Sequence, residues 1–114
     1  MQLTINDHRK VYALQEEFHQ AFPDLLIEFF EKPNKVGAPA PKKMVVRATQ
    51  TIGECRNVHK KGTLTVTPGM MVADLERDFD DVYGLSVEIL KRAGDSWTKA
   101  DANMQLASAS LQLA

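Results

Sequence analysis

The sequence predicts a single α+β domain in which helices pack on a mixed sheet of three to five strands. Three observations lead to this prediction: two helical stripes of apolar residues, several short runs typical of strands, and a length of 114 residues, which suits one hydrophobic core. The composition is that of an ordinary globular domain, with 44% hydrophobic and 25% charged residues. We therefore expect one domain over residues 1–114, with two long helices and a C-terminal helix on the sheet.

An amphipathic helix is expected over residues 7–22 and a strand over residues 25–30. The helix is indicated by apolar residues at helical spacing, namely Val11, Leu14, Phe18 and Phe22, and Pro23 ends it. The run LLIEFF at 25–30 is apolar on both alternating sets and too short for a helix, which is typical of a strand covered on both faces. Residues 31–43 contain three prolines and a glycine without apolar periodicity, and this pattern predicts an exposed, mobile loop.

A short strand is expected at 44–46, and a short helix is expected to follow it after Thr51. Glu54 follows Thr51 at the spacing of a capping box. Three residues would share one face of this helix: Ile52, Cys55 and Val58. Gly62 ends the segment.

The next elements are a strand at 63–67, a helix at 72–83 and a strand at 85–90. The run TLTVT alternates as a strand does, the helix carries an apolar stripe, and Gly84 is placed where a helix often ends in a left-handed residue. The two strands flank a helix and are too far apart for a hairpin. We therefore expect them to be parallel neighbours across a right-handed crossover.

The C-terminal part is expected to form a hairpin and a final helix. Residues 93–96 (AGDS) carry turn chemistry, residues 96–100 return as an antiparallel partner that contains Trp97, and the segment from 101 onward is rich in helix formers. The two long helices share their apolar spacing, but any core-facing helix shows it, so the spacing does not indicate an internal repeat.

The stretch from Thr51 to Trp97 also carries a resemblance. It contains TIGE, GTLTVTP, VADLERDF, YGLSVEI and AGDSW in this order, and it resembles a group of small, uncharacterised bacterial proteins. The matching positions are mostly strand, turn and helix-face residues, so the resemblance concerns the fold and implies no activity.

Several functional classes are not supported by the composition. No stretch approaches the roughly 18 to 20 apolar residues of a membrane span, and no secretion signal opens the chain. The single cysteine cannot form an intrachain disulfide, which suits a cytoplasmic protein. We expect no cofactor and no metal site, because the histidines and acidic residues lack ligand spacing. The net charge of -1 gives no overall attraction to nucleic acid or membrane.

A thiol enzyme is one hypothesis, because Cys55 and His59 are four residues apart, which places them on one side of a helix. However, no third group or oxyanion donor accompanies this pair. Cys55 shares its predicted face with apolar residues, and free cysteine is among the most buried residue types. The sequence therefore favours a packing role for Cys55.

A nucleic-acid site is an alternative hypothesis for residues 42–61. This segment concentrates positive charge with one opposing glutamate: Lys42, Lys43, Arg47, Arg56, Lys60 and Lys61. No aromatic residue lies among these cations to stack on bases. The segment would also serve as a solubilising patch.

A protein contact at the C-terminal hairpin is the preferred hypothesis. Trp97 follows the turn, and the usual burial of large aromatic side chains favours a place for it at the edge of the core. Alternatively, its ring is an exposed anchor for a partner, since tryptophan is enriched in interaction hot spots. Arg92 and Asp95 flank it in the hairpin. We expect a small, non-catalytic module that binds an unknown protein partner or associates with itself.

Overall fold

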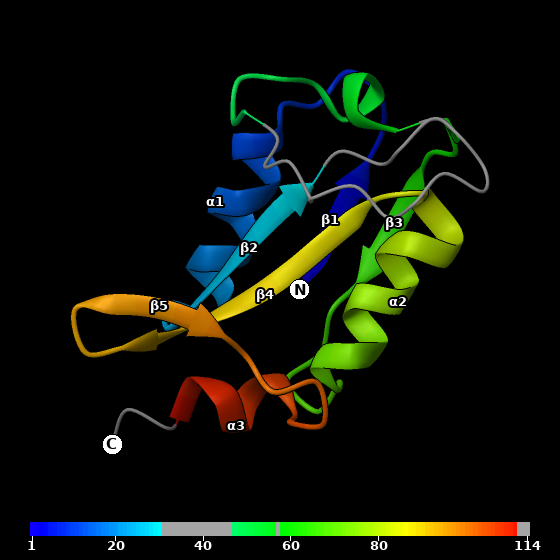
Figure 1. The fold of residues 1–114 in the computed structure, drawn as a ribbon. Helices are drawn as coiled ribbons and strands as arrows, with labels where there is room; N and C mark the ends of the chain where they lie inside the picture. The colour runs from blue at the N-terminus through cyan, green and yellow to red at the C-terminus, as the bar shows by residue number, and fades with distance from the viewer. Residues whose placement is uncertain (31–46, 57, 112–114) are drawn as a thin grey trace, which may run out of the picture.

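Among the residues that the structure describes, the fold consists of two antiparallel sheets and three α-helices (Figure 1). The computed structural model describes residues 1–30, 47–56 and 58–111. The predicted α+β class, the two long helices and the C-terminal helix are confirmed. In chain order the elements are β1 (Gln2–Ile5), α1 (Val11–Ala21), β2 (Leu25–Phe30), the 3-10 helix η1 (Ile52–Cys55), β3 (Gly62–Thr65), α2 (Val72–Tyr83), β4 (Ser86–Ala93), β5 (Ser96–Lys99) and α3 (Leu106–Leu111).

The two sheets join strands that are distant in the sequence. β1 pairs with β3, while β4 pairs with both β2 and β5, and every pair is antiparallel. The prediction that strands at 63–67 and 85–90 are parallel neighbours in a mixed sheet is wrong, because β3 and β4 belong to different sheets. The sequence analysis assigned no element to residues 2–5, and this strand, β1, takes the place beside β3. The loop expected at 31–43 and the strand expected at 44–46 lie outside the described residues.

One hydrophobic core unites both sheets and the helices into a single domain. α1 packs on β2 and α2 packs on β4. The fully buried rings of Phe29 and Phe79 meet edge-on, with centroids 5.8 Å apart. Each long helix turns one apolar face to this core, with Val11, Leu14 and Phe18 from α1 and Val72, Leu75, Phe79 and Tyr83 from α2.

The chain consists of two halves with the same order of elements. The first half is β1, α1, β2 and η1, and the second is β3, α2, β4 and α3, with β5 as an addition. Equivalent residues face each other within both strand pairs that join the halves, since Leu3 is opposite Leu64 and Glu28 is opposite Glu88. When a residue of one half pairs with the equivalent residue of the other half, a two-fold axis passes between the two residues. The two halves are thus related by a pseudo-two-fold axis that passes through both sheets.

The long helices also begin with equivalent hydrogen bonds. The first N–H groups of a helix lack partners within the helix, and here the segment before the short helix of the same half accepts them. The bonds are Val11 N to Gln50 O (2.9 Å) and Tyr12 N to Ala48 O (3.1 Å) in the first half, and Val72 N to Met104 O (2.8 Å) and Ala73 N to Ala102 O (3.0 Å) in the second. The shared apolar spacing of the two helices therefore does belong to a structural repeat, which the sequence analysis discounted.

Two helix ends follow the predicted local signals. Gly84 adopts a left-handed conformation (φ 64°) after α2, and its N–H donates to the carbonyl of Asp80. At the start of η1, the Thr51 N–H donates to Oε1 of Glu54 at 3.2 Å. This backbone hydrogen bond, together with one from the Thr51 hydroxyl, holds the pKa of Glu54 below its usual value. The sequence thus located these two helix boundaries correctly.

α1, by contrast, begins at Val11 and not at residue 7, because the N–H groups of His8 and Arg9 donate to Oδ1 of Asn6 in a turn that precedes the helix.

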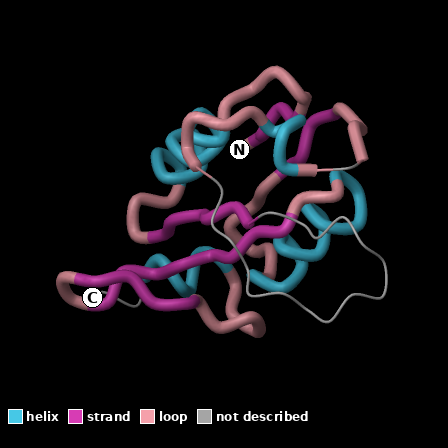
Figure 2. The backbone as a smooth tube through the Cα atoms, turned by 45° about the horizontal axis from the view of Figure 1, so that its top comes forward, coloured by secondary structure: helices cyan, strands magenta, loops and turns pink. Residues whose placement is uncertain are grey.

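β4 and β5 form a hairpin that projects from one end of the molecule (Figures 1 and 2). Its turn consists of Gly94 and Asp95, and Gly94 has a φ of 63°, which glycine adopts without steric cost. Both the turn expected at 93–96 and the antiparallel return strand are confirmed. The register places Trp97 of β5 opposite Arg92 of β4.

Candidate functional site

The indole of Trp97 is held on the hairpin by charged and aromatic neighbours. The guanidinium carbon of Arg92 lies 4.8 Å from the centroid of the Trp97 ring, within the range of a cation–π contact. On its other side, Nε of Arg92 is 3.7 Å from Oδ1 of Asp24. The ring of His19 meets the indole edge-on at 6.2 Å between centroids. This row of side chains fixes the orientation of the indole.

Trp97 is half-buried and does not belong to the hydrophobic core. The sequence favoured a place for this residue at the edge of the core, but the half-buried ring lies outside the core cluster. In the structure its neighbours Ser96, Thr98 and Lys99 are exposed, as is Asp95 at the tip of the turn. Part of the indole is therefore accessible to a partner, in an orientation that its contacts have already fixed.

The backbone of β5 has an outward edge beside this tryptophan. β5 is an edge strand of the three-stranded sheet, and the Ala100 N–H donates to Ile89 O at 2.9 Å. Because the direction of hydrogen bonding alternates along an antiparallel strand, the backbone groups of Thr98 face β4 and those of Trp97 and Lys99 face away. Within residues 1–30, 47–56 and 58–111, no strand pairs with this outward edge.

The opposite edge of the same sheet is covered by side chains of α1. Gln15 Nε2 donates to the carbonyl of Ile27 at 3.0 Å, and His19 Nδ1 lies 2.9 Å from the carbonyl of Leu25. Both carbonyls belong to the outward side of β2. The sequence analysis missed this role, because a polar residue at the border of an apolar helix stripe does not show which strand it will cap. Within the part of the chain that the structure describes, the two edges of the sheet thus differ, and β5 is the edge without a cover.

Arg56, one of the cations of the proposed nucleic-acid set, is buried. Its side chain has no exposed surface, and its Nε and Nη2 donate to Oδ1 of Asp7 at 3.1 and 2.9 Å. Nη1 donates to the carbonyl of Tyr83, in the last turn of α2, at 3.0 Å. The prediction that Arg56 belongs to a surface site is therefore wrong. Its buried guanidinium instead links Asp7, in the turn after β1, to the C-terminal end of α2.

Asp7 is shared between this arginine and His59, whose Nδ1 lies 2.8 Å from Oδ2 of Asp7. Desolvation pushes the pKa of Asp7 upward, but the hydrogen bonds from His59 and Arg56 outweigh it and hold the pKa below its usual value. Asp7 is thus ionised in the native protein and compensates the buried charge. This contact was not predictable from local sequence patterns, since 49 positions separate Asp7 from Arg56.

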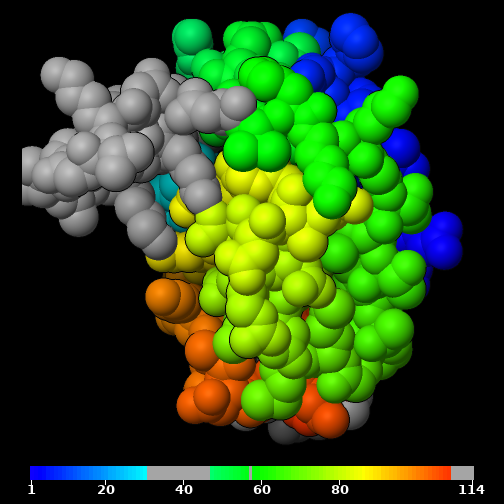
Figure 3. All heavy atoms as spheres, turned by 90° about the vertical axis from the view of Figure 1, so that its right-hand side faces the viewer, coloured from blue at the N-terminus to red at the C-terminus, as the bar shows by residue number. Residues whose placement is uncertain are grey.

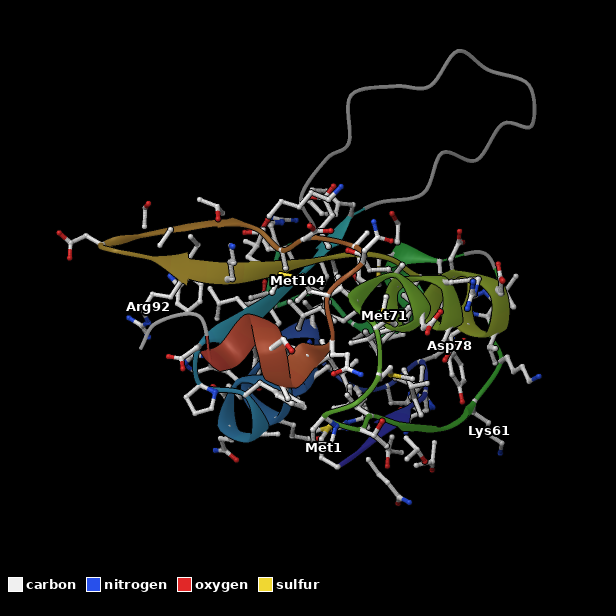
Figure 4. The ribbon with its side chains drawn as sticks, turned by 90° about the horizontal axis from the view of Figure 1, so that it is seen from below. Met1, Lys61, Met71, Asp78, Arg92 and Met104 are labelled. Atoms are coloured by element: carbon white, nitrogen blue, oxygen red, sulfur yellow. The ribbon has the colours of Figure 1, made fainter. Side chains whose placement is uncertain are left out.

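The rest of the basic set is only partly described. Arg47, Lys60 and Lys61 are exposed, whereas Lys42 and Lys43 lie outside the described residues. Lys61 is far from the hairpin, at the other end of the molecule from Arg92 (Figure 4). The two candidate surfaces are therefore physically separate and can be tested independently.

Cys55 and His59 differ in burial and in their hydrogen-bond partners. The cysteine is buried and its Sγ lies 3.3 Å from the carbonyl of Ile52, while His59 is exposed and bound to Asp7. η1 ends at Cys55, so Val58 does not share its face and is exposed, in contrast to the expected longer helix. The structure agrees with the predicted packing role of Cys55.

We expect the thiol of Cys55 to react slowly with a disulfide reagent in the native protein, because the side chain is buried and lies against a carbonyl. Absorbance of the released thiolate at neutral pH measures the rate, and denatured protein provides the unprotected control. Stoichiometric labelling at the denatured rate, with the circular dichroism unchanged, would contradict this expectation.

The surface hollows among the described residues include one at each of the two sheets. One, of about 390 Å³, lies at the β1–β3 sheet and is lined by Thr4, Ile5, Asn6, Lys61, Gly62 and Thr63. The other, of about 280 Å³, lies between α2 and β4 and is lined by Glu76, Arg77, Asp80, Ser86 and Val87. Figure 3 shows the face of the molecule at whose centre α2, part of the lining of the second hollow, lies. Neither lining contains Cys55 or Trp97, and within the described ranges no three His, Cys, Asp or Glu residues cluster as metal ligands would.

No protein-family model, curated protein or solved structure matches this chain. None of the helices in the described part of the chain is both long enough and apolar enough to span a membrane.

Proposed function

We propose that this protein is a non-catalytic protein-binding module whose contact surface is the β4–β5 hairpin. Trp97 and Arg92 would form the centre of the contact, and Asp95 would lie at its rim. One observation carries the proposal: a half-buried, pre-oriented tryptophan lies on an edge strand whose outward backbone groups have no strand partner among the described residues.

Both parts of this surface suit a protein partner. An added strand gains affinity from main-chain hydrogen bonds, and an adjacent side chain that enters a pocket gives specificity. Tryptophan and arginine are the residue types that most often dominate binding energy at interfaces. Because Arg92 and His19 already hold the indole, little side-chain entropy would be lost when a partner covers it.

The alternatives have less support. A nucleic-acid surface would depend on Arg47, Lys60 and Lys61 without Arg56, and a thiol enzyme would need a reactive Cys55. We also propose a cytoplasmic location, because a lone buried thiol suits a reducing compartment.

Replacing Trp97 by alanine is expected to weaken binding of the natural partner by at least about thirtyfold, which corresponds to the loss of about 2 kcal/mol typical of a hot spot. The tagged protein is used to capture partners from the source cell with and without nuclease, and the affinity of the captured partner is then measured by titration. Tyr12→Ala is the matched control, because Tyr12 is an aromatic residue on α1 with 45% of its surface exposed.

The proposal is supported if a nuclease-resistant partner binds the wild type and Tyr12→Ala but not Trp97→Ala. Capture that is abolished by nuclease and by replacing Lys60 and Lys61 would instead establish the nucleic-acid alternative. Circular dichroism of each variant verifies that the fold is retained.

A further inference from the structure

We infer that the β5 edge binds the β5 edge of a second copy of this chain, antiparallel and centred on Trp97. This inference rests on the proposed function and names the partner. It starts from the order of the residues around the tryptophan, Asp95, Ser96, Trp97, Thr98 and Lys99. When two such segments run antiparallel about Trp97, each residue meets a chemically complementary one.

The backbone permits this register. The N–H and C=O of Trp97 face away from β4, as argued above from the bond between Ala100 and Ile89. In an antiparallel pair, two residues whose backbone groups face each other exchange two hydrogen bonds. With the two-fold axis at Trp97, the Trp97 residues of the two copies form such a pair. The next outward residue, Lys99, then lies across from Asp95, the turn residue that directly precedes β5 in the second copy.

The charges favour this register over the two that are centred further toward the C-terminal end of β5. Centring on Trp97 places Asp95 opposite Lys99 twice, once on each side of the axis, and Ser96 opposite Thr98. If the two-fold axis lies at Thr98, the outward backbone groups of the two strands still face each other, but Asp95 of one copy comes opposite Asp101 of the other. If the axis lies at Lys99, the Lys99 side chains of the two copies come together. Like charges directly opposite each other destabilise a sheet, whereas opposite charges stabilise it.

Both charged residues have the freedom that the pairing requires. Asp95 and Lys99 are exposed, and Asp95 has no ion pair with any other described residue. Lys99 is 3.9 Å from Glu88 of the neighbouring strand, at the outer limit of an ion pair. The hairpin projects from the body of the molecule, so a second hairpin can approach along β5 (Figures 1 and 2).

The contact is short, so the association is expected to be weak and reversible. β5 has four residues, and an interface built on it is smaller than the 1,200 Å² or more of total buried surface that is usual in stable complexes. A dimer should therefore form at high protein concentration and dissociate on dilution. Sedimentation velocity over a concentration series, from about 10 µM to about 1 mM, covers the range for such contacts.

Charge reversal provides the test. Asp95→Lys and Lys99→Asp each place like charges opposite one another on both sides of the axis, so each variant alone is expected to associate at least about tenfold more weakly than the wild type. An equimolar mixture of the two variants is expected to associate again, as a heterodimer, because both facing pairs are then of opposite charge. Asp81→Lys and Lys60→Asp serve as matched controls at exposed positions outside the hairpin.

Restored association in the mixture, with unchanged association of the controls, supports the inference. A wild type that stays monomeric up to about 1 mM overturns it, as does a dimer that neither charge reversal weakens. Failure here is distinguishable from failure of the proposed function, because capture of a different protein that depends on Trp97 would persist in a strictly monomeric protein. Circular dichroism confirms that each variant is folded before sedimentation.

Discussion

Replacing Asp7 by alanine is expected to lower the free energy of unfolding by about 3 kcal/mol. The substitution leaves the guanidinium of Arg56, which has no exposed surface, without its counter-charge. Removal of one partner of a buried pair costs roughly 3 to 5 kcal/mol, and the lower end applies because Asp7 itself keeps 34% of its side chain exposed. Urea unfolding followed by circular dichroism measures the change.

Two comparisons separate this explanation from a general loss of packing. Asp81→Ala, at an exposed site, is expected to change stability by less than about 0.5 kcal/mol. Adding Arg56→Met to Asp7→Ala should recover stability, because the uncompensated charge is then gone. A double variant less stable than Asp7→Ala alone would show that Arg56 contributes mainly through its bond to the Tyr83 carbonyl.

The same pair makes stability depend on pH at the acid end. The native pKa of Asp7 lies below its usual value of 3.8, so the unfolded state takes up a proton more readily than the native state. The stabilisation is therefore fully present above about pH 4 and is lost as the pH falls through the native pKa. The stability difference between the wild type and Asp7→Ala should accordingly narrow below about pH 4.

Phe18→Ala and Phe79→Ala are each expected to cost about 3 to 5 kcal/mol, the usual range for a phenylalanine truncated in a core. Both side chains are fully buried, and they occupy equivalent positions in α1 and α2 of the structural repeat. Their costs should be similar, since each leaves a cavity between a long helix and the sheet it covers.

The matched control for these truncations is Tyr12→Ala, which removes an exposed ring from α1 and should cost far less. Chemical denaturation of the three variants under identical conditions makes the comparison. A cost below about 1 kcal/mol at either phenylalanine would contradict its place in the core.

The elements of this fold were predictable from the sequence where their signals are local. α1 and α2 have apolar stripes, and their ends are set by Pro23 and Gly84, residues that act on the adjacent backbone alone. The hairpin turn was predictable for the same reason. The pairing of strands was not, because β1 is four residues long and its partner lies about sixty positions away.

The residues of the candidate surfaces also differ in whether local sequence signals could place them. The sequence could place Trp97, Arg92 and Asp95 together because the hairpin that joins them is a local structure. Arg56 was misplaced because a cationic residue carries no sign of burial until its distant carboxylate partner is known. The open edge of β5 likewise became apparent only once the strand order showed which edge α1 covers.

The pairing of equivalent strands has a consequence for how the chain reaches its native state. Within the described residues, β1 and β2 find strand partners only in the second half, so the first half forms no sheet by itself. On the ribosome, the sheet hydrogen bonds of the first half must therefore wait until β3 and β4 have emerged, and until then its apolar strand LLIEFF lacks a partner. Contacts of such long sequence separation slow the folding reaction, and strands that wait unpaired expose the chain to aggregation.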